Sequence, residues 1–247
     1  MGKKLPPIDT LNDAAKDVVE CAEKFHKTLV SDDFARFKSW EHCYAMFHDA
    51  IHNGKVDVDT LALHLAFYLA SWGMYRGSSF LLSQDYKVHK KVVEILLEPK
   101  YRDLCGATCK QIQSQMDNLW ELTDRIKEYY HSRRYIVEKA QIAAGERDKF
   151  TASDVSDILI SKVLMGTMGC VPAYDRFFTE GVKLTGATTG QFNRPSIERL
   201  IEFYQGYHKQ FDMVLEKMSV EGRLPYPQMK LLDMGFWQMC YEPGSEE

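Results

Sequence analysis

Residues 162–178 read KVLMGTMGCVPAYDRFF, and this stretch carries the stop signal of one helix and the start signal of the next. A helical pattern of apolar residues runs up to Gly166 and Gly169, where glycine favours the end of a helix. Pro172 suits the first turn of a new helix, because its missing N–H would have no partner there in any case. The stretch therefore predicts two helices joined by a short turn, with Asp175 near the start of the second.

The same spacing of apolar residues, three and four apart, recurs along most of the chain and is typical of amphipathic helices. It is formed in the first segment by Leu11, Ala14, Val18, Ala22, Phe25 and Leu29, and in the second by Phe34, Phe37, Glu41, Tyr44, Phe47 and Ile51. No segment alternates as a strand would, no repeat is visible and no tract has low complexity. The sequence predicts an all-α, single compact, non-repeating globule of about nine helices.

The chain has 247 residues, which is enough to bury one substantial core. We expect a single domain over 1–247, with a soft boundary near 143–151, where GERDK has the composition of an exposed loop. Long helices are expected from Pro172 to about Leu184 and from Pro195 to about Met218.

Composition favours a soluble protein of the cytoplasm. Hydrophobic residues make up 45% and charged residues 27%, and the net charge of −4 disfavours nucleic acid as a partner. The six cysteines are scattered, as is typical of reduced thiols, and the N-terminus lacks the apolar core of a signal peptide. The most apolar segment, 61–75, is shorter than the roughly 20 residues that cross a membrane, so no membrane association is expected.

The histidines and cysteines do not form a metal-binding motif. His48 and His52 are four residues apart on a predicted helix, but the HDAIH stretch lacks the interior glutamate of the HExxH motif. Cys105 and Cys109 have no second pair at zinc-finger spacing. We therefore expect no metal and no cofactor.

Several charged residues lie in unusually apolar surroundings. Glu41 falls on the apolar stripe of its helix, and Asp233 lies among leucines, methionines and aromatic residues. A buried carboxylate needs a partner, and Arg76 and Arg176 are the candidates for Glu41. Lys162 lies on an apolar helix, and we expect its side chain to extend its ammonium group to the surface.

These residues lead to two hypotheses about function. In the first, one polar cavity between helical layers binds a small planar ligand, a nucleobase or nucleotide, because aromatic rings stack on bases and arginine binds phosphate. The expected lining residues are Glu41, Arg76, Tyr174, Arg176, Asp233, Trp40, Trp72 and Trp237, with Asp175 as the catalytic candidate. In the second, the same charges are internal ion pairs, and the protein is a non-enzymatic module whose exposed helix face binds a protein partner.

Three phrases, LASWGMYRGSSFLL, GCVPAYDRFF and YPQMKLLDMGFWQ, resemble a family of bacterial all-helical proteins of unknown function. The resemblance covers most of the chain. It implies a bacterial source and a helical fold, but it implies no activity.

The stretch around VPAYD also resembles the catalytic region of helix-hairpin-helix DNA glycosylases, which are all-α enzymes of similar size. The resemblance implies that Asp175 supports departure of a damaged base. It extends to no other residue, because TASDVSD replaces the glycine-rich hairpin of that family and Lys162 is too close to Asp175 to match its lyase lysine.

Overall fold

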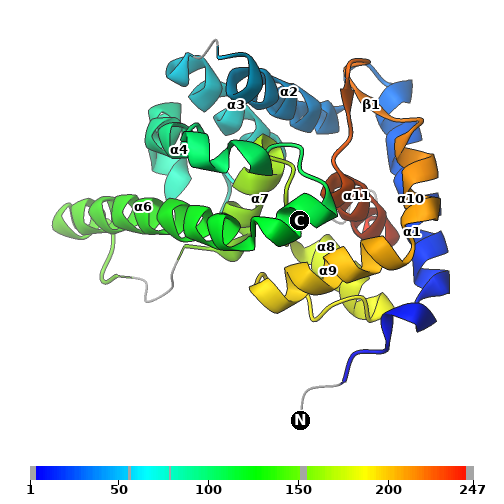
Figure 1. The fold of residues 1–247 in the computed structure, drawn as a ribbon. Helices are drawn as coiled ribbons and strands as arrows, with labels where there is room; N and C mark the ends of the chain where they lie inside the picture. Colours follow the sequence, from blue (N-terminus) through cyan, green and yellow to red (C-terminus); the bar gives the residue numbers. More distant parts are fainter. Residues whose placement is uncertain (1–3, 55–56, 78, 151–154, 243–247) are drawn as a thin grey trace.

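The computed structural model describes residues 4–54, 57–77, 79–150 and 155–242, most of which are helical (Figure 1). The α-helices are α1 (Asn12–Ser31), α2 (Ser39–Asn53), α3 (Val58–Ser71), α4 (Lys90–Leu96), α5 (Cys109–Ser114), α6 (Met116–Ala143), α7 (Asp157–Thr167), α8 (Arg176–Thr185), α9 (Arg194–Gly206), α10 (His208–Leu215) and α11 (Gln228–Cys240). The 3-10 helices are η1 (Ile8–Thr10), η2 (Arg36–Lys38), η3 (Phe80–Ser83), η4 (Tyr86–His89) and η5 (Pro99–Leu104). Within these ranges the strands are β1 (Ser219–Val220) and β2 (Leu224–Pro225), which pair antiparallel. The predicted all-α class is confirmed, with helices numbered to α11 where about nine were expected.

Two expectations about the helices were wrong in detail. The long helix expected from Pro195 is interrupted at Tyr207, whose φ of −123° and ψ of 18° separate α9 from α10. Phe34, which was expected to face inward, is 94% exposed, because α2 begins only at Ser39 and Phe34 precedes it.

The expected soft boundary near 143–151 follows the end of α6 at Ala143, and residues 151–154 lie outside the described part of the chain. A cluster of buried apolar side chains extends from Leu11 to Trp237 and so includes residues on both sides of that boundary. In the described ranges no helix has the combination of length and apolar character needed to cross a membrane.

Helix α11 packs between α1 and α8, and two glycines permit this close approach (Figure 1). A Cβ atom on Gly181 of α8 would lie 2.2 Å from the backbone oxygen of Phe236. A Cβ atom on Gly235 of α11 would lie 2.7 Å from the backbone oxygen of Val18 in α1. Because both distances are far below van der Waals contact, only glycine fits where these backbones meet.

The chain between α7 and α8 is not helical, yet residues 168–174 are buried. Buried backbone groups need hydrogen-bond partners, and side chains supply two of them here. The N–H of Ala173 donates to Asp233 Oδ1 at 2.9 Å, and the N–H of Tyr174 donates to Ser161 Oγ at 2.9 Å. Residues of α7 and α11 therefore fix the path of this segment.

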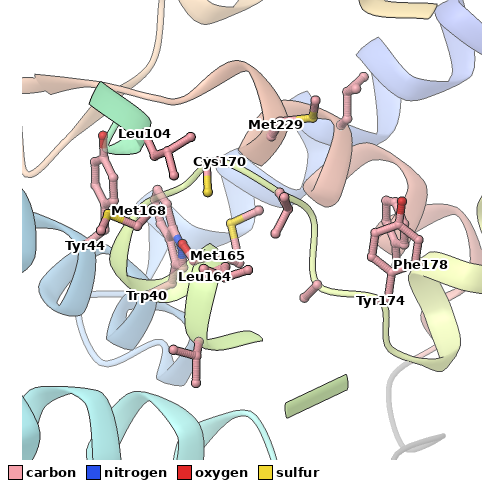
Figure 2. Packing of buried hydrophobic residues seen from close by; sticks show 14 of the residues in the cluster. Trp40, Tyr44, Leu104, Leu164, Met165, Met168, Cys170, Tyr174, Phe178 and Met229 are labelled. Carbon is pink, nitrogen blue, oxygen red and sulfur yellow. The ribbon is translucent and has the colours of Figure 1, made fainter. Parts of the chain in front are cut away.

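The first part of the segment packs against α2. Figure 2 shows Met168 and Cys170 close to Trp40 and Tyr44, whose rings stack with centroids 5.1 Å apart. The indole Nε1 of Trp40 donates to the backbone oxygen of Met165 at 2.9 Å, so α2 is also held to the end of α7.

A buried histidine links η4 to α6 and to the loop that follows α3. His89 is fully buried; its Nε2 lies 2.7 Å from Tyr75 Oη and its Nδ1 lies 2.6 Å from Tyr130 Oη. Burial lowers the pKa of His89 to about 3. The imidazole is therefore neutral at neutral pH and holds the two tyrosines through its two nitrogens.

We predict that Gly181→Ala lowers the free energy of unfolding by about 1–3 kcal/mol, because the new methyl group meets backbone that cannot move aside cheaply. Urea unfolding measures the change. Gly206→Ala is the matched control, since its Cβ would meet only the Ile8 side chain, at 3.1 Å. We expect the control to change stability by less than about 1 kcal/mol, given the better helix propensity of alanine. Equal stabilities for both variants would show that the α8–α11 contact is looser than described.

The stability of the protein should fall as the pH falls through the ordinary range of histidine. The pKa of His89 is depressed in the folded state, so the stabilisation is complete above the unfolded pKa of about 6.5 and is lost towards pH 3. Over about two pH units below 6.5, His89 should account for roughly 2–3 kcal/mol. His89→Gln, which cannot titrate, should flatten the pH dependence of the melting temperature. His208→Gln, at an exposed position, should leave it unchanged.

Candidate functional site

A cavity of about 260 Å³ opens where the loop after α3 meets α7, the start of α8 and α11. We call it the aromatic cavity. Its lining residues are Arg36, Phe37, Ala70, Ser71, Trp72, Gly73, Tyr75, Arg76, Lys162, Asp175, Phe177 and Trp237.

Four aromatic side chains that line this cavity contact one another. The ring of Phe37 lies 4.8 Å from that of Trp72 and 5.4 Å from that of Trp237, centroid to centroid. Phe177 lies 5.4 Å from Trp237 in an edge-to-face arrangement. Residues from η2, the α3 loop, α8 and α11 thus form one aromatic cluster, which favours stacking with a planar ligand.

A second cavity of about 450 Å³ adjoins the first, and we call it the neighbouring cavity. The two share Trp72, Gly73, Arg76, Lys162, Asp175 and Phe177. The neighbouring cavity adds Arg176, whose guanidinium carbon lies 4.5 Å from the ring centroid of Phe177. In the aromatic cavity the same arrangement occurs between Arg36 and Phe37, at 4.8 Å. Each arginine is thus placed over the aromatic ring that follows it in sequence.

Both cavities are lined by an ion pair between Lys162 and Asp175. The Lys162 Nζ lies 3.3 Å from Asp175 Oδ2 and donates to the backbone oxygen of Trp72 at 2.8 Å. The side chains are 6% and 13% exposed, so the expectation that Lys162 reaches the surface was wrong. The ammonium group finds a carboxylate and a carbonyl inside the protein, and these partners offset the loss of water.

Asp175 also begins α8. It is the N-cap residue, and its Oδ1 accepts from the N–H of Phe178 at 3.2 Å. The sequence predicted Asp175 inside a helix that begins at Pro172, but α8 starts at Arg176. The reason is that the Asp175 carboxylate accepts from a backbone N–H of the first turn, which has no carbonyl partner within the helix. Burial raises the pKa of the Asp175 carboxyl, while the nearby Lys162 ammonium opposes the rise and Asp233 adds to it.

A second buried ion pair lies behind the cavity wall. Lys230 Nζ is 2.8 Å from Asp233 Oδ2, and both side chains are at most 5% exposed. The same ammonium group lies 5.3 Å from the ring centroid of Trp72, and Lys162 Nζ lies 5.8 Å from it. The Trp72 indole is thus near two buried cations, one of which lines the cavity.

The structure brings together part of the site that the sequence predicted. Arg76, Asp175, Trp72 and Trp237 line the aromatic cavity, and Arg176 lines the neighbouring one. The first and last of these residues, Trp72 and Trp237, are more than 150 positions apart in the chain.

Four predicted lining residues lie elsewhere. The carboxylate of Glu41 accepts from the hydroxyl of Tyr226, so its partner is a tyrosine and not Arg76 or Arg176. Asp233 is held by Lys230 and by the N–H of Ala173, outside both cavities.

The other two are buried in the core. Trp40 stacks on Tyr44 and donates to the backbone of Met165. The Tyr174 hydroxyl lies 2.8 Å from Ser196 Oγ, and its residue lines a separate hollow with Asp157 and Phe192. Among the described lining residues of the two cavities, neither Trp40 nor Tyr174 occurs.

Sequence reasoning missed Lys162, Phe37, Phe177, Arg36 and Tyr75 as lining residues. The repeated Arg-Phe pair, in ARFK and DRFF, was a usable signal for the arginines and phenylalanines. For Lys162 the apolar helix predicts a side chain that extends to the surface, whereas its ammonium group is paired inside the protein. Tyr75 carried no signal, because no local pattern pairs it with His89, which follows 14 positions later.

The described residues contain no group of three or more His, Cys, Asp or Glu side chains that could hold a metal ion. The rings of His48 and His52 do lie together, with centroids 4.4 Å apart. Asp49 Oδ1 lies 4.0 Å from His48 Nδ1.

Comparison with known proteins gave no match: no family model, no curated protein and no solved structure is similar to this chain. The two resemblances drawn from the sequence therefore stay predictions, and the function has to be inferred from the cavities themselves.

We predict a strong energetic coupling between Lys162 and Asp175. Asp175→Asn alone should cost about 3–5 kcal/mol, because it leaves a buried ammonium group without its carboxylate. Lys162→Met alone should cost a similar amount. The double variant should cost much less than the sum, since it removes both charges and asparagine still caps α8. Urea unfolding of the four proteins gives the coupling energy. Additive losses would mean that the two groups do not stabilise each other.

Proposed function

We propose that the two cavities bind a small, planar, anionic ligand of the nucleotide class, with the base in the aromatic cavity and the phosphate towards the arginines. The observation that carries this proposal is that aromatic rings and cationic groups line the same hollow. Phe37, Trp72 and Trp237 line it, and aromatic rings of this kind pack against heterocycles.

The charges support an anion. Four cationic residues, Arg36, Arg76, Arg176 and Lys162, line the two cavities, and Asp175 is the one carboxylate among their described lining residues. The chain as a whole has a net charge of −4, so this local excess of positive charge departs from the rest of the molecule. A concave site in which one sign of charge predominates raises the local concentration of oppositely charged ligands.

The volumes also support a ligand of this size. Pockets for small molecules usually measure about 300–1,000 Å³, and cavities of about 260 and 450 Å³ share six lining residues. A base and a phosphorylated sugar could therefore occupy adjoining spaces.

Catalysis at a bound nucleotide would depend on Asp175. The weaker resemblance implies hydrolysis of an N-glycosidic bond, with the carboxylate supporting departure of the base. The position of Asp175 at both cavities supports this reaction as a second candidate. Release of free base from a nucleotide or from DNA is the assay for it. The release should be absent in the double variant Lys162→Met/Asp175→Asn, which should keep its fold because both charges are removed.

The competing proposal is a non-enzymatic module that binds a protein partner. Exposed apolar side chains favour it: Phe34 is 94% exposed, and Phe67 of α3 is 59% exposed. If nucleotides fail to bind, and substitution of Phe34 and Phe67 weakens association with a protein partner, the interaction module replaces the nucleotide site as the proposed function.

We predict that a panel of nucleoside monophosphates, titrated by calorimetry, contains at least one ligand for the wild-type protein. Arg76→Gln should weaken that ligand about tenfold or more, because a charge-assisted hydrogen bond to phosphate contributes about 1.5–3 kcal/mol. The affinity of Arg76→Gln for the corresponding nucleoside, which lacks the phosphate, should fall much less.

Arg102→Gln is the matched control for this experiment. Arg102 is exposed and donates to the backbone oxygen of His52, away from both cavities. Equal losses of affinity in Arg76→Gln and Arg102→Gln, or no binding of any nucleotide, would overturn the proposal.

A further inference from the structure

A buried chain of hydrogen bonds runs from Tyr130 through His89 to Tyr75, and Tyr75 is one of the residues that line the aromatic cavity. Tyr75 lines that cavity and is only partly buried, whereas His89 and Tyr130 are fully buried. Within the described residues, the Tyr130 hydroxyl has one hydrogen-bond partner, His89 Nδ1, at 2.6 Å. The Tyr75 hydroxyl has His89 Nε2, at 2.7 Å.

These contacts fix which group donates at each step. A neutral imidazole has one N–H donor and one acceptor nitrogen, and the lowered pKa of His89 keeps it neutral. The Tyr130 O–H is buried, so leaving its hydrogen without an acceptor would be costly. Tyr130 therefore donates to Nδ1. The hydrogen of the imidazole must then be on Nε2, which donates to the Tyr75 oxygen.

The opposite arrangement satisfies fewer groups. If Nδ1 carried the hydrogen, it would donate to Tyr130, and the Tyr130 hydrogen would have no acceptor among the residues that the structure describes. The Tyr75 hydroxyl would then donate to Nε2 and could offer the cavity only an acceptor. The first arrangement leaves no buried donor unpaired, and only in that arrangement is the Tyr75 hydrogen left for the cavity.

We infer that Tyr75 acts as a hydrogen-bond donor towards the aromatic cavity, set in that role by His89 and Tyr130, and that it selects ligands which place an acceptor oxygen beside it. This inference rests on the proposed nucleotide site, and it identifies Tyr75 as a specificity residue. The oxygen could belong to the phosphate or to a carbonyl group of the base, since both accept from a phenol.

The tautomer of His89 tests the first half of the inference without any ligand. Long-range proton–nitrogen NMR correlation of uniformly nitrogen-15-labelled protein distinguishes the two forms, and loss of the signals in His89→Gln assigns them. We expect the directly bonded hydrogen on Nε2. A hydrogen on Nδ1 would overturn the inference.

The affinity of Tyr75→Phe tests the second half. We expect its dissociation constant for the tightest nucleoside monophosphate to rise about tenfold. Tyr129→Phe is the matched control, because Tyr129 donates to the backbone oxygen of Val88 and does not line either cavity among the described residues. It should bind as the wild type does. Unchanged affinity in Tyr75→Phe would overturn the ligand contact even if the tautomer is as expected.

The same titrations show whether the acceptor oxygen belongs to the phosphate or to the nucleoside. They also distinguish failure of the proposed nucleotide site from failure of the Tyr75 contact alone. If Tyr75→Phe weakens the nucleotide but not the nucleoside, the acceptor is the phosphate; if it weakens both, the acceptor is on the nucleoside. If the wild type binds no nucleotide at all, the proposed function fails and Tyr75 loses its role in nucleotide selection. In that case the Nε2–H tautomer would still support Tyr75 as a donor to the cavity.

Discussion

The buried, non-helical connection between α7 and α8 is the constraint on which the rest of the site depends. Its backbone groups are cut off from water and lie outside any helix, so each needs another partner, and at Ala173 and Tyr174 side chains supply it. Asp233 and Ser161 do so from α11 and α7, and they fix the position of the residues that follow. Asp175 then lies where it can both cap α8 and meet the Lys162 ammonium group.

The two buried ion pairs follow from this arrangement. Asp233 accepts from the N–H of Ala173 with one oxygen and from Lys230 with the other, so a single carboxylate joins α11 to the connection between α7 and α8. Lys162 and Lys230 both lie within 6 Å of the Trp72 ring centroid. Buried pairs of this kind add little net stability compared with apolar packing, but breaking one is costly, so they make one geometry the favoured one. The residues of the cavity wall are therefore held in place by contacts within the protein itself.

The helical class and most helices were predictable, because amphipathic periodicity is a local property of the sequence. The same reasoning found Arg76, Asp175, Trp72 and Trp237, since charged and large aromatic residues in apolar surroundings are conspicuous. It could not find which carboxylate pairs with which cation. Glu41 pairs with Tyr226 and Asp175 with Lys162 because of how the helices pack, and no local pattern encodes that packing.

The predicted start of α8 was also wrong, because a side chain further along the sequence caps that helix. Proline at 172 suggested the first turn, but the carboxylate of Asp175 is the acceptor that begins α8. The close approach of α8 and α11 at Gly181 was invisible for a similar reason, since a glycine inside a helix says nothing about which backbone lies against it.

The most direct test of the proposed nucleotide site uses the indole N–H signals of the four tryptophans in nitrogen-15-labelled protein. Trp72 and Trp237 line the aromatic cavity, whereas Trp40 is buried against Tyr44 and Trp120 packs on Phe192. On titration with the nucleoside monophosphate of highest affinity, the signals of Trp72 and Trp237 should shift with saturation, and those of Trp40 and Trp120 should stay in place. Shifts confined to Trp40 or Trp120, or no saturable shift at any tryptophan, would contradict a ligand site in this cavity.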